Sequence, residues 1–210
     1  MKPEITVNTQ SSIRIQTAET VIRFDPFKIA GEPHDADIIF ITHDHYDHFS
    51  PEDIRKVSRP DTLLVAPKSM KKALAKHGFT DPVLLAPGES AEVRHIPVEA
   101  VASYNLMKPF HPKSNGNLGY VITAEDRRIY AAGDTDAVRE AAAVRCDIAF
   151  VPIGGTFTMN AKEAAELINT IRPEIAVPIH YGSIVGKISD SDVFRSLVDA
   201  DIETMLLLTE

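Results

Sequence analysis

Apolar and polar positions alternate loosely in the first part of the chain, and this pattern predicts short strands. The alternation breaks at Gln10-Ser11-Ser12, which predicts a hairpin turn. Pro26 ends the next strand, because proline has no N–H to donate to a neighbouring strand. The segment DADIIFIT, which ends at Thr42, has a continuous apolar run instead, and such a run is typical of a strand buried on both faces.

From residue 50 onward, predicted strands and helices alternate. Ser50 is a good helix N-cap with a proline and two acids after it, and Thr158 or Asn160 can cap a later helix. The pattern predicts strands in TLLVAP, VLLAPG, HIPVEAVASY, DIAFVPIGG, EIAVPIHYG and IETMLLL, a hairpin in YVITAEDRRIYAAGD, and helices in SMKKALAKHG, DAVREAAAV, NAKEAAELINTI and DSDVFRSLVDA. Residues 105–119 form a long loop, and loops of this length are usually functional or disordered. No linker interrupts the pattern, so we expect one α/β domain over residues 1–210.

Composition narrows the possible functions. With 44% apolar and 25% charged residues, a chain of 210 residues can bury a sizeable core. The net charge of −8 argues against a nucleic-acid partner. Cys146, the single cysteine, excludes an intrachain disulfide, and its apolar setting predicts a core residue. Neither a signal-peptide core nor a membrane-spanning apolar run is present, so we expect a cytoplasmic protein without a membrane contact.

The residues most suited to metal binding or catalysis lie in ITHDHYDHFS, directly after the continuous apolar run. Capping the following helix needs one acceptor, so it does not account for three imidazoles within six positions. Because residues i and i+2 of an extended backbone point the same way, His43 and His45 can reach one cation. Asp47 and His48 lie on the turn into the helix and can reach a second cation. Imidazole and carboxylate ligands suit Zn²⁺ first, with Mn²⁺ and Fe as alternatives, so one or two ions are expected.

Two later strand ends supply further candidate ligands. Asp134 ends RIYAAGD, where Gly133 lets the backbone approach closely, and His180 follows EIAVPI. Taken alone, Asp134 is an ordinary helix N-cap and His180 an ordinary structural histidine. Together with the histidine cluster they predict a metal centre, in which the carboxylate of Asp134 can bridge two ions.

These motifs resemble those of the metallo-β-lactamase superfamily. The resemblance rests on THDHYDH after a buried strand, GDT at 133–135 and IHYG at 179–182, and DPF at 25–27 is similar to an early aspartate motif of the family. The pattern is most similar to the branch of ascorbate-6-phosphate-lactonase-like metal-dependent hydrolases. The resemblance implies an αββα sandwich of two mixed β-sheets with helices on the outer faces.

The resemblance also implies roles for individual residues. It places His43 and His45 on a first metal, Asp47, His48 and His180 on a second, and Asp134 between them. Asp25 would be a supporting residue that orders nearby loops, although a strand-ending Asp-Pro turn accounts for it equally well.

One position departs from the family pattern. The family usually has a third histidine on the first metal, and the expected strand-end position holds Asn105 in this chain. Three alternatives remain: Asn105 is a weak ligand, His111 folds back as the ligand, or the first metal is poorly held. Of the other histidines, we expect His95 to be structural inside a strand, and His34 and His77 to be solvated.

The expected reaction is hydrolysis of an ester, lactone, amide or phosphoester bond in a small substrate by a metal-activated water. Asp47 would orient or deprotonate this water, and His111 would donate a proton to the leaving atom. Lys108 and Lys113 on the long loop, and Tyr104 just before it, would contact the substrate. An anionic group is one kind of substrate group that the two lysines could bind. The alternatives are a metal-binding sensor or scaffold without turnover and, less favoured because of the charge, a nuclease.

Overall fold

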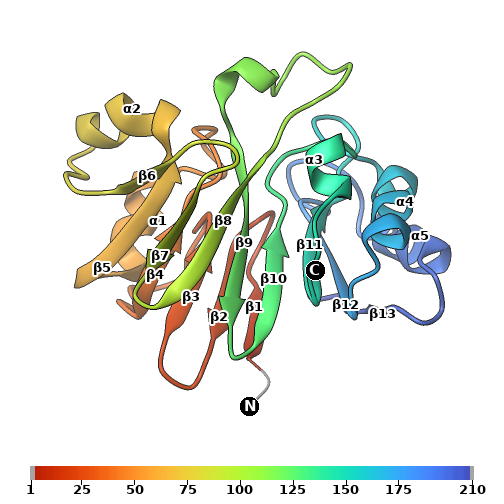
Figure 1. The fold of residues 1–210 in the computed structure, drawn as a ribbon, viewed down its shortest axis with the longest axis horizontal. Helices are drawn as coiled ribbons and strands as arrows, with labels where there is room; N and C mark the ends of the chain where they lie inside the picture. The colour runs from red at the N-terminus through yellow and green to blue at the C-terminus, as the bar shows by residue number, and fades with distance from the viewer. Residues whose placement is uncertain (1–2, 209–210) are drawn as a thin grey trace.

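Two β-sheets face each other in the computed structural model, which describes residues 3–208 (Figure 1). The first sheet consists of β1 (Glu4–Val7), β2 (Ile13–Gln16), β3 (Val21–Phe24), β4 (Ala36–Phe40), β5 (Ser58–Pro67) and β6 (Val83–Leu85). The second consists of β7 (Ser90–Val93), β8 (Ile96–Ala102), β9 (Leu118–Ala124), β10 (Arg127–Ala131), β11 (Ile148–Pro152), β12 (Ile175–Ile179) and β13 (Glu203–Thr204).

Each sheet begins with antiparallel strands and continues with parallel ones. In the first sheet β1, β2 and β3 are antiparallel, and β3 through β6 are parallel. In the second sheet β7 through β10 are antiparallel, and β10 through β13 are parallel. Both sheets are therefore mixed, as the family resemblance implied.

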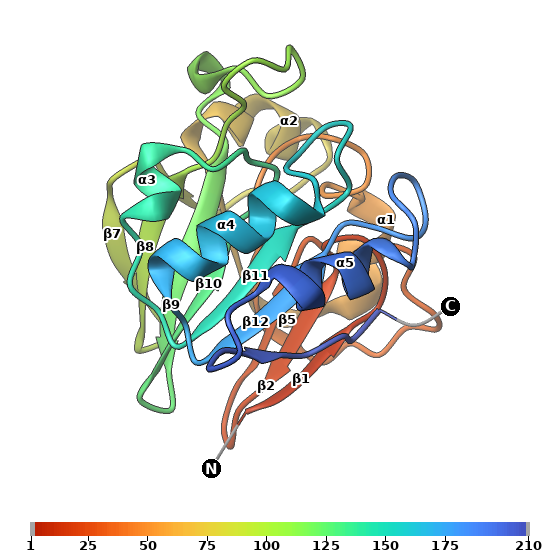
Figure 2. The same cartoon turned by 90° about the vertical axis from the view of Figure 1, so that its right-hand side faces the viewer.

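The helices lie on the outer sides of the two sheets. They are α1 (Pro51–Val57), α2 (Lys71–Lys76), α3 (Arg139–Ala142), α4 (Ala161–Ile171) and α5 (Asp190–Leu197), with short 3-10 turns η1 (Lys68–Met70) and η2 (Lys113–Asn115). Figure 1 shows α1 and α2 beside the first sheet and α3 to α5 on the opposite side of the molecule. In Figure 2, α4 and α5 lie across β11 and β12. The expected αββα sandwich is confirmed. No helix within residues 3–208 has the length and apolar character needed to cross a bilayer.

Strand β4 is buried on both faces, as its continuous apolar run predicted. Ile38 and Phe40 belong to the main core, in which the rings of Phe40 and Tyr120, from opposite sheets, have centroids 5.0 Å apart. Ile39 belongs to a second apolar cluster, which contains residues of α1 and α2. Because both faces of β4 are held by packing, the backbone that continues from it into the histidine cluster is fixed in position.

Most predicted elements are present, with differences at their ends. The helix predicted in SMKKALAKHG begins as the 3-10 turn η1, and the helix predicted in DAVREAAAV is reduced to the four residues of α3. The strand predicted in IETMLLL contains two residues, β13. Asn160 is the N-cap of α4, with a capping box to Glu163.

Strand β7 is absent from the sequence prediction, and its presence corrects the interpretation of His95. The strand pairs antiparallel with β8 across a turn formed by Arg94 and His95, both with positive φ. His95 is therefore exposed on a turn and is not a structural residue inside a strand. His34 and His77 are exposed in a loop and at the end of α2, as expected.

Candidate metal centre

The ends of four strands meet at one edge of the sandwich and carry the predicted side chains. His43 comes three residues after the end of β4, Asp134 three residues after β10, and His180 directly after β12. Asn105 likewise comes three residues after the end of its strand, β8. The backbone needs glycine at Gly133, because φ is +64° and a Cβ there would lie 2.9 Å from the carbonyl oxygen of Leu118.

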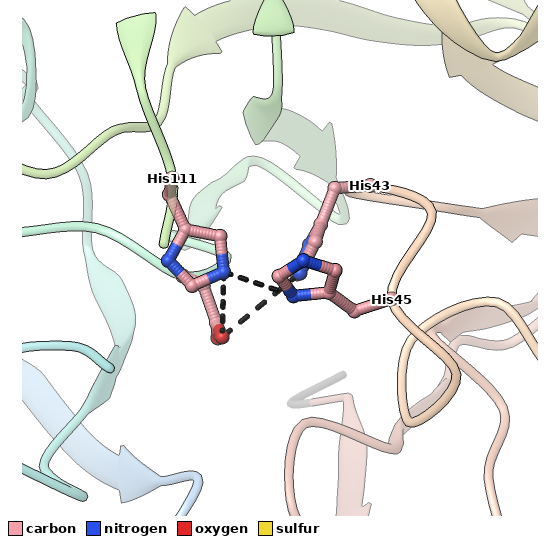
Figure 3. A group of neighbouring side chains, drawn as sticks. His43, His45 and His111 are labelled. Atoms are coloured by element: carbon pink, nitrogen blue, oxygen red, sulfur yellow. Dashed lines mark hydrogen bonds and ion pairs between the residues drawn. The ribbon is translucent and has the colours of Figure 1, made fainter. Parts of the chain in front are cut away.

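Three histidines and one aspartate form a first group. Ligand atoms of His43, His45, His111 and Asp134 all lie within 4.8 Å of one another. The Nε2 atom of His111 is 3.1 Å from Nδ1 of His45 and 3.4 Å from Oδ2 of Asp134. Figure 3 shows the three imidazole rings turned toward one another, from the turn after β4 and from the loop after β8. These side chains could hold one metal ion between them.

A second group lies on the other side of the same aspartate. It contains Asp47, His48 and His180, with ligand atoms within 4.8 Å of one another. Asp134 reaches it through both oxygens: Oδ1 is 3.3 Å from Nε2 of His48, and Oδ2 is 3.3 Å from Nε2 of His180. The carboxylate of Asp134 therefore lies between the two groups, where a bridging ligand would be needed.

Several atoms of both groups are buried without a hydrogen-bond partner in the described part of the chain. They are Nε2 of His43, Nε2 of His48, Oδ1 of Asp134 and both ring nitrogens of His180. Buried polar atoms are normally paired, because leaving them unpaired costs free energy. Imidazole nitrogen and carboxylate oxygen converging in this way fit a divalent metal such as Zn²⁺, Mn²⁺ or Fe²⁺.

Asp25 and Thr42 fix the orientation of two of the histidines. The carboxylate of Asp25 accepts hydrogen bonds from the Thr42 hydroxyl at 2.6 Å and from Nδ1 of His48 at 2.7 Å. Since the only hydroxyl proton of Thr42 goes to Asp25, Nδ1 of His43, 3.0 Å from that hydroxyl, must be the donor to it. Both rings thus hold their protons on Nδ1 and turn Nε2 toward the groups described above.

Asn105 does the same for His111. Its amide oxygen accepts from the backbone N–H of His111 at 3.0 Å and from the ring Nδ1 at 3.1 Å. Its amide nitrogen donates to the carbonyl of Phe157 at 3.0 Å. The loop therefore folds back on Asn105 and brings His111, rather than Asn105, into the first group. Of the three alternatives left by the sequence, this geometry favours His111 as the third ligand.

The charges of the two groups depend on one another. Burial alone would raise the pKa of Asp134, but His180 and His48 outweigh it and hold this pKa well below its usual range. Burial lowers the pKa of His43 well below normal, and neighbouring His48 lowers it further. The same burial would lower the pKa of His48, but Asp134 and Asp25 raise it well above its usual value. An ionised carboxylate and a neutral His43 are the forms that bind a cation.

A cavity of about 300 Å³ opens beside the two groups. Its lining residues are His45, Tyr46, Asp47, Phe110, Asp134, Phe157, His180 and Ile184. The sequence analysis did not single out its apolar members. Phe110 and Phe157 are aromatic residues within otherwise polar loops, and that contrast was the available signal.

The three residues predicted to contact substrate do not line this cavity. Lys108 pairs with Asp136 at 2.5 Å. Lys113 pairs with Glu140 at 2.7 Å, and Tyr104 donates to the same carboxylate at 2.9 Å. Both ammonium groups thus have carboxylate partners within the protein, so their placement gives no support to a role in binding an anionic substrate.

Comparisons with known proteins agree with this geometry. The family model described as the beta-lactamase superfamily domain matches residues 4–180. A UPF0173 metal-dependent hydrolase of Thermoplasma acidophilum is 32% identical over 199 residues, covering 89% of this chain and 86% of the relative. A solved structure from Parabacteroides distasonis, described as a candidate metal-dependent hydrolase, has a TM-score of 0.83 and 28% identity, and the match covers 99% of this chain and 94% of that one.

The fold and the paired histidine–aspartate groups are those of a metal-dependent hydrolase. The chain belongs to the metallo-β-lactamase superfamily, and its relatives in the UPF0173 group carry the same description. The prediction made from THDHYDH, GDT and IHYG is therefore confirmed at the level of the superfamily and of the enzyme class.

Proposed function

We propose that the centre holds two adjacent divalent metal ions, zinc by preference, and hydrolyses a small substrate. The first ion would be held by His43, His45 and His111, the second by Asp47, His48 and His180, with Asp134 shared between them. The observation that carries the proposal is the convergence of buried, unpartnered imidazole and carboxylate atoms at one edge of the sandwich.

A divalent metal, when bound, supplies Lewis acidity and lowers the pKa of a coordinated water toward about 7. The residues of the chain prepare the site for this chemistry. Asp25 and Thr42 hold the Nδ1 protons of His43 and His48, so Nε2 is the atom that each ring presents to a cation. Because its neighbours raise the pKa of His48, this ring would bind a metal with loss of its Nε2 proton. Asp47 lines the cavity, and His180 and His48 outweigh its burial and lower its pKa, so the carboxylate is ionised at neutral pH and can accept a proton from water.

His111 takes a different role from the one expected of a proton donor. Its Nδ1 donates to Asn105, and its Nε2 faces His45 and Asp134. Neither nitrogen is directed away from the first group toward a leaving atom. We therefore propose that His111 is a ligand only, and that Asp47 is the acid–base residue of the site.

The same residues and metal ions would suit several classes of scissile bond in the substrate. Ester, lactone, amide and phosphoester bonds all present an oxygen that a metal can polarise. The cavity volume of about 300 Å³ is at the lower end of small-molecule sites, which supports a small substrate.

The test is metal removal and reloading of the purified protein. Stripped protein should lose hydrolysis of aryl esters or bis-aryl phosphates and regain it with Zn²⁺ or Mn²⁺, with elemental analysis giving the metal content. His180→Ala should lose both metal and activity, whereas His77→Ala, at an exposed histidine on α2, should keep both. Protein that never retains metal and is unaffected by chelators would refute the proposal.

The reasons for considering the two alternative functions, a non-catalytic sensor or scaffold and a nuclease, do not apply at this site. A sensor or scaffold without turnover was suggested by the missing third histidine, and we propose that His111 takes that role. A nuclease needs cations to hold phosphates, and no lysine or arginine is among the cavity-lining residues of the described chain.

A further inference from the structure

The cavity beside the metal centre has one polar side and one apolar side. The polar side is the centre itself. The apolar side consists of Tyr46, Phe110, Phe157 and Ile184. Tyr46 and Phe110 are 65% and 40% exposed, whereas every side chain of the two groups except His45 is buried. This second side has no part in holding a metal, so its composition bears on the substrate.

Four separate loops build this apolar wall. Tyr46 comes from the turn after β4, Phe110 from the loop after β8, Phe157 from the loop between β11 and α4, and Ile184 from the loop between β12 and α5. The rings of Phe110 and Phe157 meet edge to face, with centroids 4.6 Å apart at an interplanar angle of 88°. Edge-to-face pairs are a preferred aromatic geometry, so each ring steadies the other beside the cavity.

No lysine or arginine of the described chain lines the cavity. Its charged members, apart from the histidines, are the carboxylates Asp47 and Asp134. Lys108 and Lys113 are paired with Asp136 and Glu140. The ammonium of Lys28 lies 5.4 Å from the ring centroid of Phe27, 3.5 Å from the hydroxyl of Ser183, and outside the lining.

We propose that the part of the substrate that is not cleaved is uncharged and apolar, a phenyl-sized ring or a short branched alkyl group, and lies against Phe110, Phe157, Tyr46 and Ile184. Apolar surface removed from water against this wall favours such a group. A carboxylate or phosphate at the same place would lose its hydration without gaining a cation. The inference rests on the proposed function for where the reacting bond lies.

Binding of three hydroxamates to the metal-loaded protein tests this directly by calorimetry. Acetohydroxamate, benzohydroxamate and the hydroxamate of succinic acid share one metal-binding group and differ in a methyl, a phenyl and an anionic tail. We expect benzohydroxamate to bind at least about tenfold more tightly than acetohydroxamate, because additional apolar groups in such pockets are each worth about tenfold or more. The anionic compound should bind no more tightly than acetohydroxamate.

Variants connect the preference to the wall. Phe110→Ala and Phe157→Ala should each reduce the advantage of the phenyl tail several-fold while leaving the metal content unchanged, and Phe157→Leu should retain most of it. Met107→Ala is the matched control, since Met107 is on the same loop, 94% exposed and outside the cavity. Ile184→Lys supplies the missing cation and should improve binding of the anionic hydroxamate relative to the other two.

The outcomes separate this inference from the proposed function. Protein that takes up no metal and binds none of the hydroxamates would refute the proposed function, and the inference would fall with it. Protein that holds metal and binds all three equally, or prefers the anionic one, would overturn the inference and leave the metal centre standing. A phenyl preference unaffected by Phe110→Ala and Phe157→Ala would also overturn it, because the wall would not be its source.

Discussion

At the scale of single residues, the site depends on side chains that do not line the cavity. Asp25, Thr42 and Asn105 each hold an Nδ1 proton of a histidine, directly or through one hydroxyl, and leave Nε2 facing the centre. Ligand groups held in this way bind metal more tightly, because the ring need not be reoriented or change its tautomer.

Removing the Asn105 amide should therefore weaken the first metal position. Asn105→Ala leaves Nδ1 of His111 without its acceptor, and we expect metal affinity to fall about 10–100-fold. Competition with a chromogenic chelator measures it, and Asn115→Ala, at an exposed position of the same loop, is the control. Unchanged affinity in Asn105→Ala would show that the loop holds His111 without this contact.

Cys146 should be a poorly reactive thiol. Burial, together with Asp147, raises its pKa to about 12, so at about pH 8 the reactive thiolate is roughly a thousandfold scarcer than in an ordinary cysteine. Alkylation by iodoacetamide, followed by mass spectrometry, should be slow in the folded protein and fast after denaturation. Equally fast labelling in both states would contradict this assignment.

The sequence predicted the side chains of the candidate metal centre better than their neighbours. Spacing alone placed His43 to His48 together, since the period of extended backbone is a local property. The position of His111, rather than Asn105, beside His43 and His45 could not be predicted, because it depends on hydrogen bonds of Asn105 that form only in the folded loop. The apolar cavity wall was missed for the same reason, as its residues meet only in the folded chain.

At the scale of elements, the sequence predicted helices and strands correctly where their capping or turn residues were typical. The helix α4 was predicted with Thr158 or Asn160 as its cap, and the structure has Asn160 there in a capping box with Glu163. Strand β7 was missed because its turn to β8 uses Arg94 and His95 at positive φ, where asparagine or glycine is the usual signal.

Asn160→Ala should destabilise the protein by about 1 kcal/mol, because two backbone N–H groups of α4 lose their acceptor. The loss should appear as a lower midpoint in urea with an unchanged slope. Lys162→Ala, at an exposed position in the first turn of the same helix, should change stability little. A loss of similar size in both variants would mean that the cap is not the cause.

At the scale of the whole molecule, the candidate metal centre takes its residues from both sheets, in addition to the apolar core that lies between them. His43, His45, Asp47 and His48 follow a strand of the first sheet, whereas Asp134 and His180 follow strands of the second. The local sequence pattern does not determine which strands pair in each sheet. The sandwich was therefore predicted from the family resemblance.

Metal should therefore stabilise the fold as well as the site. A ligand at about 100 times its Kd adds about 2.7 kcal/mol when it binds only the folded state, so we expect Tm to rise by several degrees with Zn²⁺ and to fall again with a chelator. Differential scanning calorimetry at several metal concentrations measures this. In His180→Ala the rise should be smaller, and an equal rise would place the stabilising ion elsewhere.

The order of strands has a consequence for how the chain can be divided. Each sheet is formed by one continuous half, and in each half an aspartate follows the strand where pairing changes from antiparallel to parallel: Asp25 after β3 and Asp134 after β10. The halves thus share one change of strand pairing, with a boundary between β6 and β7. Two fragments cut there would each lack part of the ligand set, so we expect metal uptake only when both are mixed. Metal retention by either fragment alone, measured after dialysis, would contradict a shared centre.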